Sequence, residues 1–328
     1  MKAVLMSLAV AGSLLAGGSR AEAQTPLVLE AKIPLGEVRG RIDHMAFDLA
    51  RRRLFVAELE NDSVAVVDVM ARKVLHVITD MKGPQGLGYA PATDTLYAAN
   101  GGDGSLRMFH GEDYRPIHDL QLGDDADNVR LDAETNQVFV GYGSGALAVI
   151  DAASRSKTSE IVLTAHPEGF QLDRATNRIY VNDPRGGAVV VVDRVSGKST
   201  AIWKTGNGSN FPMALDGASG HVLVVFRNPA ELVAFAAPNG TVAARVDTCG
   251  DADDAFVDAS RGRVYVSCGE GFVDAFDASG GVYRRIARVA TLKGARTSLF
   301  VPELDRLFVA ARATPEEGAA IWVFRPGP

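Results

Sequence analysis

A short strand-like segment that closes on an acid or a turn residue recurs seven times along the chain. The last residues of these segments are Asp48, Ala90, Asp132, Asp173, Asp216, Asp258 and Pro302. Successive copies therefore lie 42, 42, 41, 43, 42 and 44 residues apart. A steady period of this length is the signature of a repeat protein, in which each repeat is one supersecondary unit. This repeat constrains the fold more strongly than any other feature of the chain.

Each repeat contains four runs that are typical of β-strands. The recurring segment is followed by a second run such as LYAAN at Leu96, then by a Gly/Asn/Asp-rich break, a third run such as VVVVD and a fourth run. β-Branched and aromatic residues are enriched in these runs, and turn residues separate them. No segment beyond the first 23 residues has helical periodicity. We therefore predict an all-β fold, a seven-bladed β-propeller with four-stranded blades.

The two ends of the chain complement each other. The seventh copy contains only three strand-like runs, whereas residues 29–36 (LEAKIPLG) resemble fourth runs such as HDLQLG at residues 118–123. We expect the N-terminal strand to close the last blade, because closure removes an exposed sheet edge. The prediction is a single propeller domain over residues 24–328, with no linker.

The repeat resembles a known type. The segments LYAANGGDGSLRMF at residues 96–109 and VFVGYGSGALAVIDAAS at residues 138–154 have an aromatic-bearing second strand, a turn rich in Asn or Gly, and a third strand. In these features the chain resembles the bacterial secreted YVTN-repeat (YncE-like) seven-bladed β-propeller family over nearly its whole length. Residues 222–237 depart from the pattern, since they lack the Asn turn and the terminal Asp. The resemblance implies an exported propeller and little chemistry, because propellers host many unrelated functions.

The first 23 residues read as a secretory signal peptide. Lys2 precedes an apolar run over residues 3–15, and Ala21-Glu22-Ala23 forms a small-residue cleavage site before Gln24. The apolar run is too short for a membrane anchor. We therefore expect a periplasmic or secreted protein without a membrane span.

Charge argues against a nucleic-acid partner. The net charge is −6, and the longest basic cluster is Arg51-Arg52-Arg53. Binding to nucleic acid relies on a basic surface that neutralises phosphates, which this composition does not supply. We expect a monomer whose partner is a small molecule, a metal ion or a protein.

The residues that precede the first strand of each blade are expected to form a ring at one mouth of the central channel. Counting back from the repeated strand end puts a carboxylate at the same place in four blades: Asp43, Asp127, Glu168 and Asp253. In blade seven the same count reaches Thr297. The remaining candidates for the mouth are His44, Gln85, Asn128, His166, Asn210, Asp254 and Arg296. These side chains have two interpretations. They are either solvated residues that line a water-filled channel and bind nothing, or they form an acidic ligand-binding site.

A divalent metal is one candidate ligand or cofactor of this mouth. Carboxylate and amide oxygens suit Ca²⁺, and histidines admit Zn²⁺. The candidate metal ligands are Glu168, Asn128, Asp253 and His44. Crowded carboxylates raise one another's pKa, so the site could also move protons, with His44 and His166 as the candidate catalytic residues. The arrangement is similar in architecture, but not in motif, to that of calcium-dependent propeller lactonases.

The two cysteines of the chain are expected to form a disulfide. Cys249 precedes the first strand of blade six, and Cys268 ends the antiparallel second strand, which returns to the same mouth. A bond between them would pin residues 251–254 (DADD) at the channel rim. No C-x-x-C motif accompanies them, which disfavours a redox role.

Three functions stay open at this point. The leading hypothesis is an exported propeller that binds a small ligand, a metal ion or a protein partner at an acidic channel mouth. The second is a metal-dependent hydrolase of the lactonase kind, or a lyase, with its site in the channel. The third is a scaffold that uses the blade rims for protein contacts.

Overall fold

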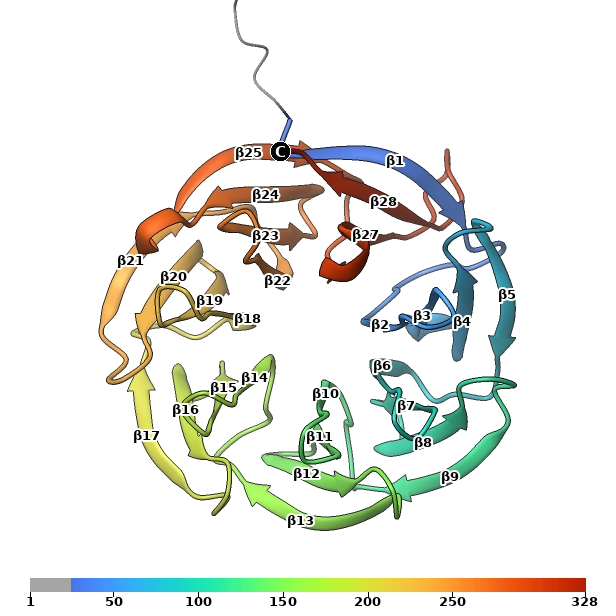
Figure 1. Ribbon diagram of the computed structural model, residues 1–328, viewed down its shortest axis with the longest axis horizontal. Coiled ribbons are helices and arrows are strands. Elements are labelled where there is room, and N and C mark those ends of the chain that lie inside the picture. The colour runs from blue at the N-terminus through green and yellow to red at the C-terminus, as the bar shows by residue number, and fades with distance from the viewer. Residues whose placement is uncertain (1–24) are drawn as a thin grey trace, which may run out of the picture.

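The computed structural model describes residues 25–328, so the signal peptide predicted over residues 1–23 lies outside the described residues. The described chain forms seven four-stranded antiparallel sheets arranged radially around a central channel (Figure 1). In the first six sheets, the order of strands along the chain is also their order from the channel to the rim (Figure 1). The fold is an all-β, seven-bladed β-propeller, which confirms the architecture predicted from the repeat.

The blades are numbered in chain order, and their strands are given from the channel outward. Blade one comprises β2 (Met45–Asp48), β3 (Arg53–Glu58), β4 (Ser63–Asp68) and β5 (Lys73–Ile78), and blade two comprises β6 (Pro84–Ala90), β7 (Thr95–Asn100), β8 (Ser105–His110) and β9 (Pro116–Gln121). Blade three comprises β10 (Val129–Asp132), β11 (Gln137–Tyr142), β12 (Ala146–Asp151) and β13 (Ser156–Val162). Blade four comprises β14 (Phe170–Asp173), β15 (Arg178–Asp183), β16 (Ala188–Asp193) and β17 (Ser199–Lys204).

Blades five to seven follow the same plan, and the last ends on the N-terminal strand. Blade five comprises β18 (Asn210–Asp216), β19 (His221–Arg227), β20 (Ala230–Ala236) and β21 (Val242–Asp247). Blade six comprises β22 (Ala252–Asp258), β23 (Arg263–Cys268), β24 (Phe272–Asp277) and β25 (Arg284–Ala290). Blade seven comprises β26 (Ser298–Val301), β27 (Arg306–Ala311), β28 (Ala320–Pro326) and β1 (Leu27–Pro34). Short 3₁₀ helices occur at η1 (Leu59–Asn61), η2 (Ser279–Gly281) and η3 (Pro302–Leu304). No helix among residues 25–328 has the length and apolar character needed to cross a bilayer.

The second strand of each blade is buried on both faces because neighbouring blades pack against it. An aromatic residue occupies the same buried position in six of these strands: Phe55, Tyr97, Phe139, Tyr180, Tyr265 and Phe308. Some of these rings pack on the first strand of the next blade. Phe55 packs on Tyr89 and Tyr265 on Phe300, with ring centroids 5.7 and 5.6 Å apart. The aromatic-bearing strand of the repeat is therefore what joins one blade to the next.

β1 closes the ring. It pairs antiparallel with β28, from Leu27 opposite Pro326 to Pro34 opposite Ala320. In Figure 1 the blue strand β1 runs along the outside of the red strand β28. Ile33 of β1 is fully buried in the apolar cluster between blades seven and one. The prediction that the N-terminal strand completes the last blade is confirmed, and it covers the edge that β28 would otherwise expose.

The acids that end the first strands form turns. Asp48 accepts hydrogen bonds from the backbone amides of Ala50 and Arg51 at 3.0 and 3.2 Å. Equivalent bonds to backbone amides occur at Asp132, Asp173, Asp216 and Asp258. Asp side chains favour such turns, so these recurring acids belong to the fold and not to a site.

The alignment of blade seven is corrected by one residue. Val301 pairs with Arg306 as Asp48 pairs with Arg53, so Val301 and not Pro302 ends the first strand. Pro302 has no backbone N–H for the ladder and begins η3 instead. The residue that matches Asp43 in blade seven is therefore Arg296, and the sequence-based match to Thr297 was wrong.

Candidate functional site

One repeated backbone arrangement positions a ring of seven residues at the channel mouth. The amides of Asp43, Asp127 and Glu168 donate to the carbonyls of the second strands at 2.7, 2.9 and 3.1 Å, which extends each inner hairpin by one residue. With the corrected register, this mouth ring consists of Asp43, Gln85, Asp127, Glu168, Phe211, Asp253 and Arg296. The next residue of each blade forms a second ring: His44, Gly86, Asn128, Gly169, Pro212, Asp254 and Thr297.

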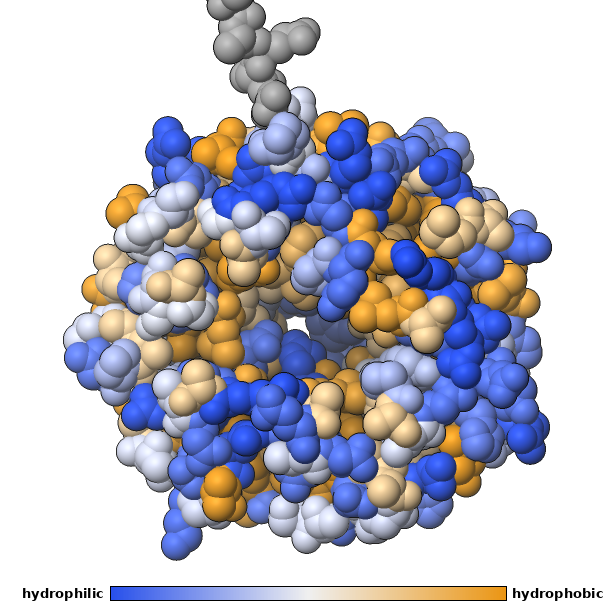
Figure 2. All heavy atoms as spheres, in the orientation of Figure 1, coloured by the Kyte–Doolittle hydropathy of each residue, from blue (hydrophilic) through white to orange (hydrophobic). Residues whose placement is uncertain are grey.

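These rings enclose a polar cavity of about 200 Å³ at the mouth of the channel. Viewed down the ring, the molecule is open at its centre (Figure 2). Nine of the eleven predicted mouth residues lie on the cavity wall: His44, Gln85, Asp127, Asn128, His166, Glu168, Asp253, Asp254 and Arg296. Phe211, at the aligned mouth position of blade five, lies on this wall as well. The structure also places there six residues that sequence analysis missed: Arg41, Asp125, Arg130, Gln171, Arg227 and Phe256.

The other two predicted mouth residues do not line the cavity. Asn210 is fully buried, and its amide donates to Asn182 Oδ1 at 3.1 Å and to the carbonyl of Ala188 at 2.8 Å, which ties blade five to blade four. Asp43 is also buried, with one carboxylate oxygen 2.8 Å from Arg41 Nη2. Asn210 is a structural residue, whereas the charge of Asp43 acts on the cavity residues His44 and Asp127 although Asp43 does not line the cavity itself.

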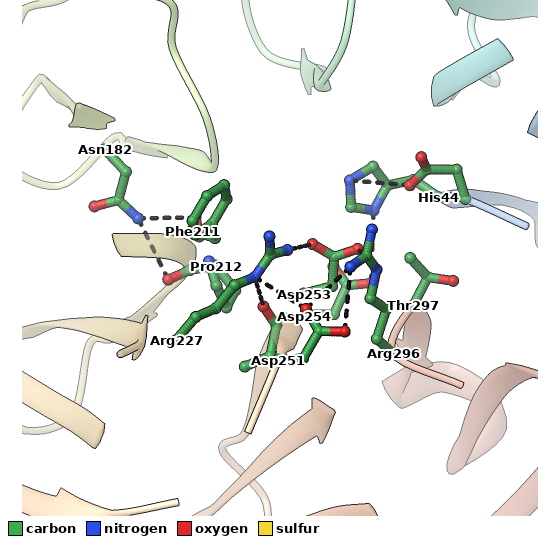
Figure 3. A network of polar contacts seen from close by, with 12 residues as sticks. His44, Asn182, Phe211, Pro212, Arg227, Asp251, Asp253, Asp254, Arg296 and Thr297 are labelled. Carbon is green, nitrogen blue, oxygen red and sulfur yellow. Dashed lines mark hydrogen bonds and ion pairs between the residues drawn. The ribbon is translucent and has the colours of Figure 1, made fainter. Parts of the chain in front are cut away.

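Arginines neutralise much of the mouth. Arg227 and Arg296 lie on either side of the Asp251–Asp253 segment (Figure 3). Arg296 contacts Asp251 Oδ1 at 3.0 Å through Nη1 and Asp253 Oδ2 at 2.9 Å through Nε. Arg227 pairs with Asp253, and its guanidinium stacks on the ring of Phe211 at 3.6 Å. The four charged side chains form one alternating network that holds this side of the mouth in place.

The expectation of an acidic mouth is therefore wrong. The cavity wall carries five carboxylates, but also four arginines and two histidines. Sequence analysis placed Arg296 at the mouth but missed the other three arginines, because they lie outside the two positions that were aligned. Arg41 precedes the mouth ring, Arg130 lies deeper in the channel, and Arg227 comes from the end of β19, a second strand.

His44 is an imidazolium in this setting. Burial alone would lower its pKa, but Asp254, Asp43 and Asp127 together raise the pKa of His44 to about 10. Its Nδ1 lies 3.5 Å from Asp254 Oδ2, and its Nε2 lies 3.8 Å from Asp43 Oδ1. A group that stays protonated through neutral pH acts as a fixed cation and not as a general base.

Three acids of the mouth ring are displaced toward their neutral forms. Burial raises the pKa of Asp43, although His44 and Arg41 oppose it. Burial, reinforced by the nearby charges of Asp43 and Glu168, raises the pKa of Asp127 to about 7. Burial likewise raises the pKa of Glu168, although His166 and Arg227 oppose it. The negative charge of the mouth at neutral pH is therefore smaller than the count of carboxylates indicates.

The candidate metal ligands do not form a metal site. Within residues 25–328, no group of three or more His, Cys, Asp or Glu side chains is placed to hold an ion. Of the candidates Glu168, Asn128, Asp253 and His44, Asp253 is paired with two arginines and His44 is itself cationic. The donor set therefore does not fit Ca²⁺ or Zn²⁺, each of which needs several converging unpaired donors.

Arg130 is the one charge at its level of the channel. Seven residues, one from each blade, pair with the same position of the second strand: Ala46, Gly88, Arg130, Gln171, Ala214, Phe256 and Leu299. Arg130 donates from Nε to the carbonyl of Phe170 at 3.1 Å and from Nη1 to its neighbour Val129 at 2.9 Å. Among the described residues it forms no ion pair with a carboxylate, and its Nη2 makes no hydrogen bond within residues 25–328.

A second cavity of about 430 Å³ continues the channel below this level. Its wall is mainly apolar, and it shares five residues with the mouth cavity: His44, Arg130, Gln171, Asp254 and Phe256. These five residues are therefore the boundary between a charged upper chamber and an apolar lower chamber.

The predicted disulfide is present. Cys249 and Cys268 are fully buried and bonded, with Cα atoms 5.8 Å apart. Just beyond Cys249, the amide of Gly250 donates to Glu270 Oε2 at 2.8 Å. The bond fixes the start of the segment that carries Asp251 and Asp253, so it supports the arginine network at the rim.

Comparison with known proteins supports the fold alone. No protein-family model and no curated protein sequence matches the chain. Among solved structures, a chain of the mitotic checkpoint complex has 12% identity and a TM-score of 0.77 over 98% of both chains. The WD40 repeats of RRP9 have 12% identity and a TM-score of 0.77, covering 92% of this chain and all of theirs. A chain of Kuenenia stuttgartiensis hydrazine synthase has 16% identity and a TM-score of 0.70, covering 81% of this chain and 91% of its own. Membership of the YVTN-repeat family stays a prediction.

Proposed function

We propose that this propeller is a binding protein whose channel mouth holds a small carboxylate, with the Arg130 guanidinium as the principal contact. The observation that carries the proposal is the isolation of this side chain. It is the only charge among seven equivalent channel positions, and it has no carboxylate partner within the described residues. A cation that is partly buried and unpaired favours an anionic ligand.

The surroundings of Arg130 suit recognition by hydrogen bonds. A guanidinium presents its donors in a planar fork that matches a carboxylate. The amide of Asn128 and the imidazolium of His44 lie on the same cavity wall. These groups supply further donors without a metal ion, and the cavity of about 200 Å³ limits the polar part of the ligand to a few atoms.

The rival functions have less support. A metal-dependent hydrolase or lyase needs converging donors, and the acids of this mouth are paired with arginines or shifted toward their neutral forms. A scaffold that uses the blade rims needs no isolated charge in the channel. The binding function accounts for that charge, and for this reason we prefer it.

The location proposed for this binding is the periplasm or the cell exterior. The support for export is the leader-like pattern of residues 1–23 and the resemblance of the repeat to exported propellers. N-terminal sequencing of the protein from a periplasmic fraction tests this point. A mature chain that begins at Gln24 is the expected result, and retention of Lys2 in the purified protein would contradict it.

Thermal unfolding with added ligands tests the function. Acetate, butyrate and lactate are expected to raise the melting temperature of the wild-type protein, because a ligand bound only to the folded state stabilises it. Inorganic phosphate, Ca²⁺ and Zn²⁺ serve as comparison probes. The carboxylate shift is expected to disappear in Arg130→Gln and to persist in Arg72→Gln, which alters an exposed arginine far from the channel. Equal shifts in the wild type and Arg130→Gln, or a shift with the metals alone, would contradict the proposal.

A further inference from the structure

The channel below Arg130 changes from charged to apolar. The lower chamber is lined by the side chains of Phe47, Tyr89, Leu131, Phe256 and Leu299, among others. The hydroxyl of Tyr89 is engaged outside the channel, where it donates to Asp94 Oδ1 at 2.7 Å, so the chamber is offered mainly the ring. At the boundary above this lumen the His44 cation faces Asp254, which leaves Arg130 as the cation without a carboxylate partner among the described residues. An apolar lumen beneath such a cation is the environment of a ligand that has one charged end and one apolar end.

We infer that the ligand is an amphiphilic monocarboxylate, whose carboxylate contacts Arg130 while its hydrocarbon body occupies the lower chamber. This inference rests on the proposed function and specifies the class of ligand. The two chambers share Arg130 and Phe256, so they adjoin along the channel, which is open at its centre when viewed down the ring (Figure 2). A ligand whose head contacts Arg130 therefore has its body next to the lower chamber.

The volumes fit a body larger than a benzene ring. An apolar cavity of about 150 Å³ is enough to hold benzene. The lower chamber measures about 430 Å³, which leaves room for a chain of several methylenes or for an aryl-alkyl group. Each buried methylene contributes through the hydrophobic effect, so affinity is expected to rise with chain length.

Charge favours a single negative charge on the ligand. Asp127 and Asp254 are close enough to Arg130 to influence its pKa. Both line the mouth cavity, as Arg130 does. A dianion such as a phosphate ester would meet these carboxylates as well as the guanidinium. A monocarboxylate satisfies the cation with less repulsion.

Calorimetric titration with acetate, butyrate, hexanoate and octanoate tests the inference. Each added methylene is expected to lower Kd by at most roughly fourfold. The inference requires that Kd for octanoate be at least about tenfold lower than Kd for butyrate. Octyl phosphate and 1-octanol carry the same chain with a different head group. Both are expected to bind less tightly than octanoate.

Two leucine variants form a matched pair. Leu299→Gln puts a polar group of similar size in the lower chamber, whereas Leu75→Gln alters an exposed leucine on the outermost strand β5. Leu299→Gln is expected to weaken the binding of octanoate more than that of butyrate, and so to flatten the dependence of affinity on chain length. Leu75→Gln is expected to match the wild type for all four acids. Thermal unfolding of both variants checks that each is folded.

The outcomes separate the two proposals. Carboxylates that bind through Arg130 with no gain from chain length would overturn the amphiphile and leave the carboxylate site intact. Octanol that binds as tightly as octanoate, with no effect of Arg130→Gln, would overturn the assignment of the carboxylate to Arg130. No binding by any carboxylate would overturn both.

Discussion

Nδ1 of His44 lies 3.5 Å from Oδ2 of Asp254, and this contact joins blade one to blade six across blade seven. The same oxygen of Asp254 accepts a hydrogen bond from the backbone amide of Ser298 in blade seven at 2.8 Å. Three blades thus meet at one carboxylate on the channel side of the ring, opposite the rim where β1 completes blade seven. The charge of His44 therefore contributes to the integrity of the ring as well as to the potential inside the channel.

The His44 contact predicts a loss of stability in alkaline solution. The folded-state pKa is about 10, above the ordinary value of 6.5. A raised histidine pKa contributes stability in full below the unfolded value, and this contribution is lost as the pH rises toward the folded value. His44→Gln is expected to be less stable than the wild type at pH 6 by on the order of 2–4 kcal/mol, with the difference shrinking toward pH 10.

Urea unfolding of the wild type and the His44→Gln variant between pH 6 and 10 measures this difference. His118→Gln, which alters an exposed histidine on β9, is the control and is expected to follow the wild type at every pH. A constant gap between the wild type and His44→Gln across this range would contradict the assigned pKa shift.

Asp127 also makes the folded protein lose stability as the pH rises, but in a lower pH window, and its removal is expected to stabilise the fold rather than weaken it. Its folded-state pKa is about 7, above the ordinary value of 3.8, so the folded chain retains a proton that the unfolded chain loses. The charged form is disfavoured in the fold, and this penalty grows as the pH rises from about 4 to about 7. Asp127→Asn is expected to match the wild type near pH 4 and to exceed its stability above pH 7, by roughly 1–3 kcal/mol. Chemical denaturation at the two pH values checks this, and an Asn variant that is less stable at pH 8 would refute it.

The disulfide is expected to stabilise the protein through the loop that it closes. Cys249 and Cys268 are 19 residues apart. Loop-closure entropy for a loop of this length corresponds to about 3 kcal/mol. The double variant Cys249→Ala/Cys268→Ala should lose about this much in denaturant unfolding, and reduction of the wild type should lose a similar amount. A loss confined to the reduced wild type would point to damage by the reductant instead.

Ring closure by β1 predicts an asymmetry within that strand. Ile33 is fully buried, whereas Val28 on the same strand is 40% exposed. Ile33→Ala is expected to cost about 2–5 kcal/mol, because it removes buried methyl groups and leaves a cavity. Val28→Ala is expected to cost less than about 1 kcal/mol. Thermal or urea unfolding measures both changes, and equal losses would mean that β1 does not carry the closure.

The repeat and its strand order could be predicted from sequence because they follow local rules. Period-two runs, turn residues and the spacing near 42 residues describe the blades, and the missing fourth strand of blade seven describes the closure. The Asp residues that end five of the seven first strands follow such a local rule too, because each accepts hydrogen bonds from the backbone amides of the turn after it. The error at Pro302 arose where a proline took the place of the recurring acid and shifted the apparent strand end by one residue.

The chemistry of the mouth could be predicted only in part, because it depends on contacts between blades. Equivalent positions could be aligned, but Arg227 reaches Asp253 from the neighbouring blade and from a second strand. Asn210 was aligned correctly near the mouth, yet it turns toward Asn182 in the interface. The sequence does contain one signal for Arg130. It is the only charged residue at an aligned position that is small, apolar or an amide in the other blades.

The most direct test of the account compares the affinity of butyrate for the wild-type protein and for Arg130→Gln by calorimetry. Loss of a charge-assisted hydrogen bond costs about 1.5–3 kcal/mol, so Kd is expected to rise by roughly tenfold or more. Arg130→Lys keeps the charge without the planar fork, so it should fall between the two. Equal Kd values for the wild type and Arg130→Gln would contradict a carboxylate site in this channel.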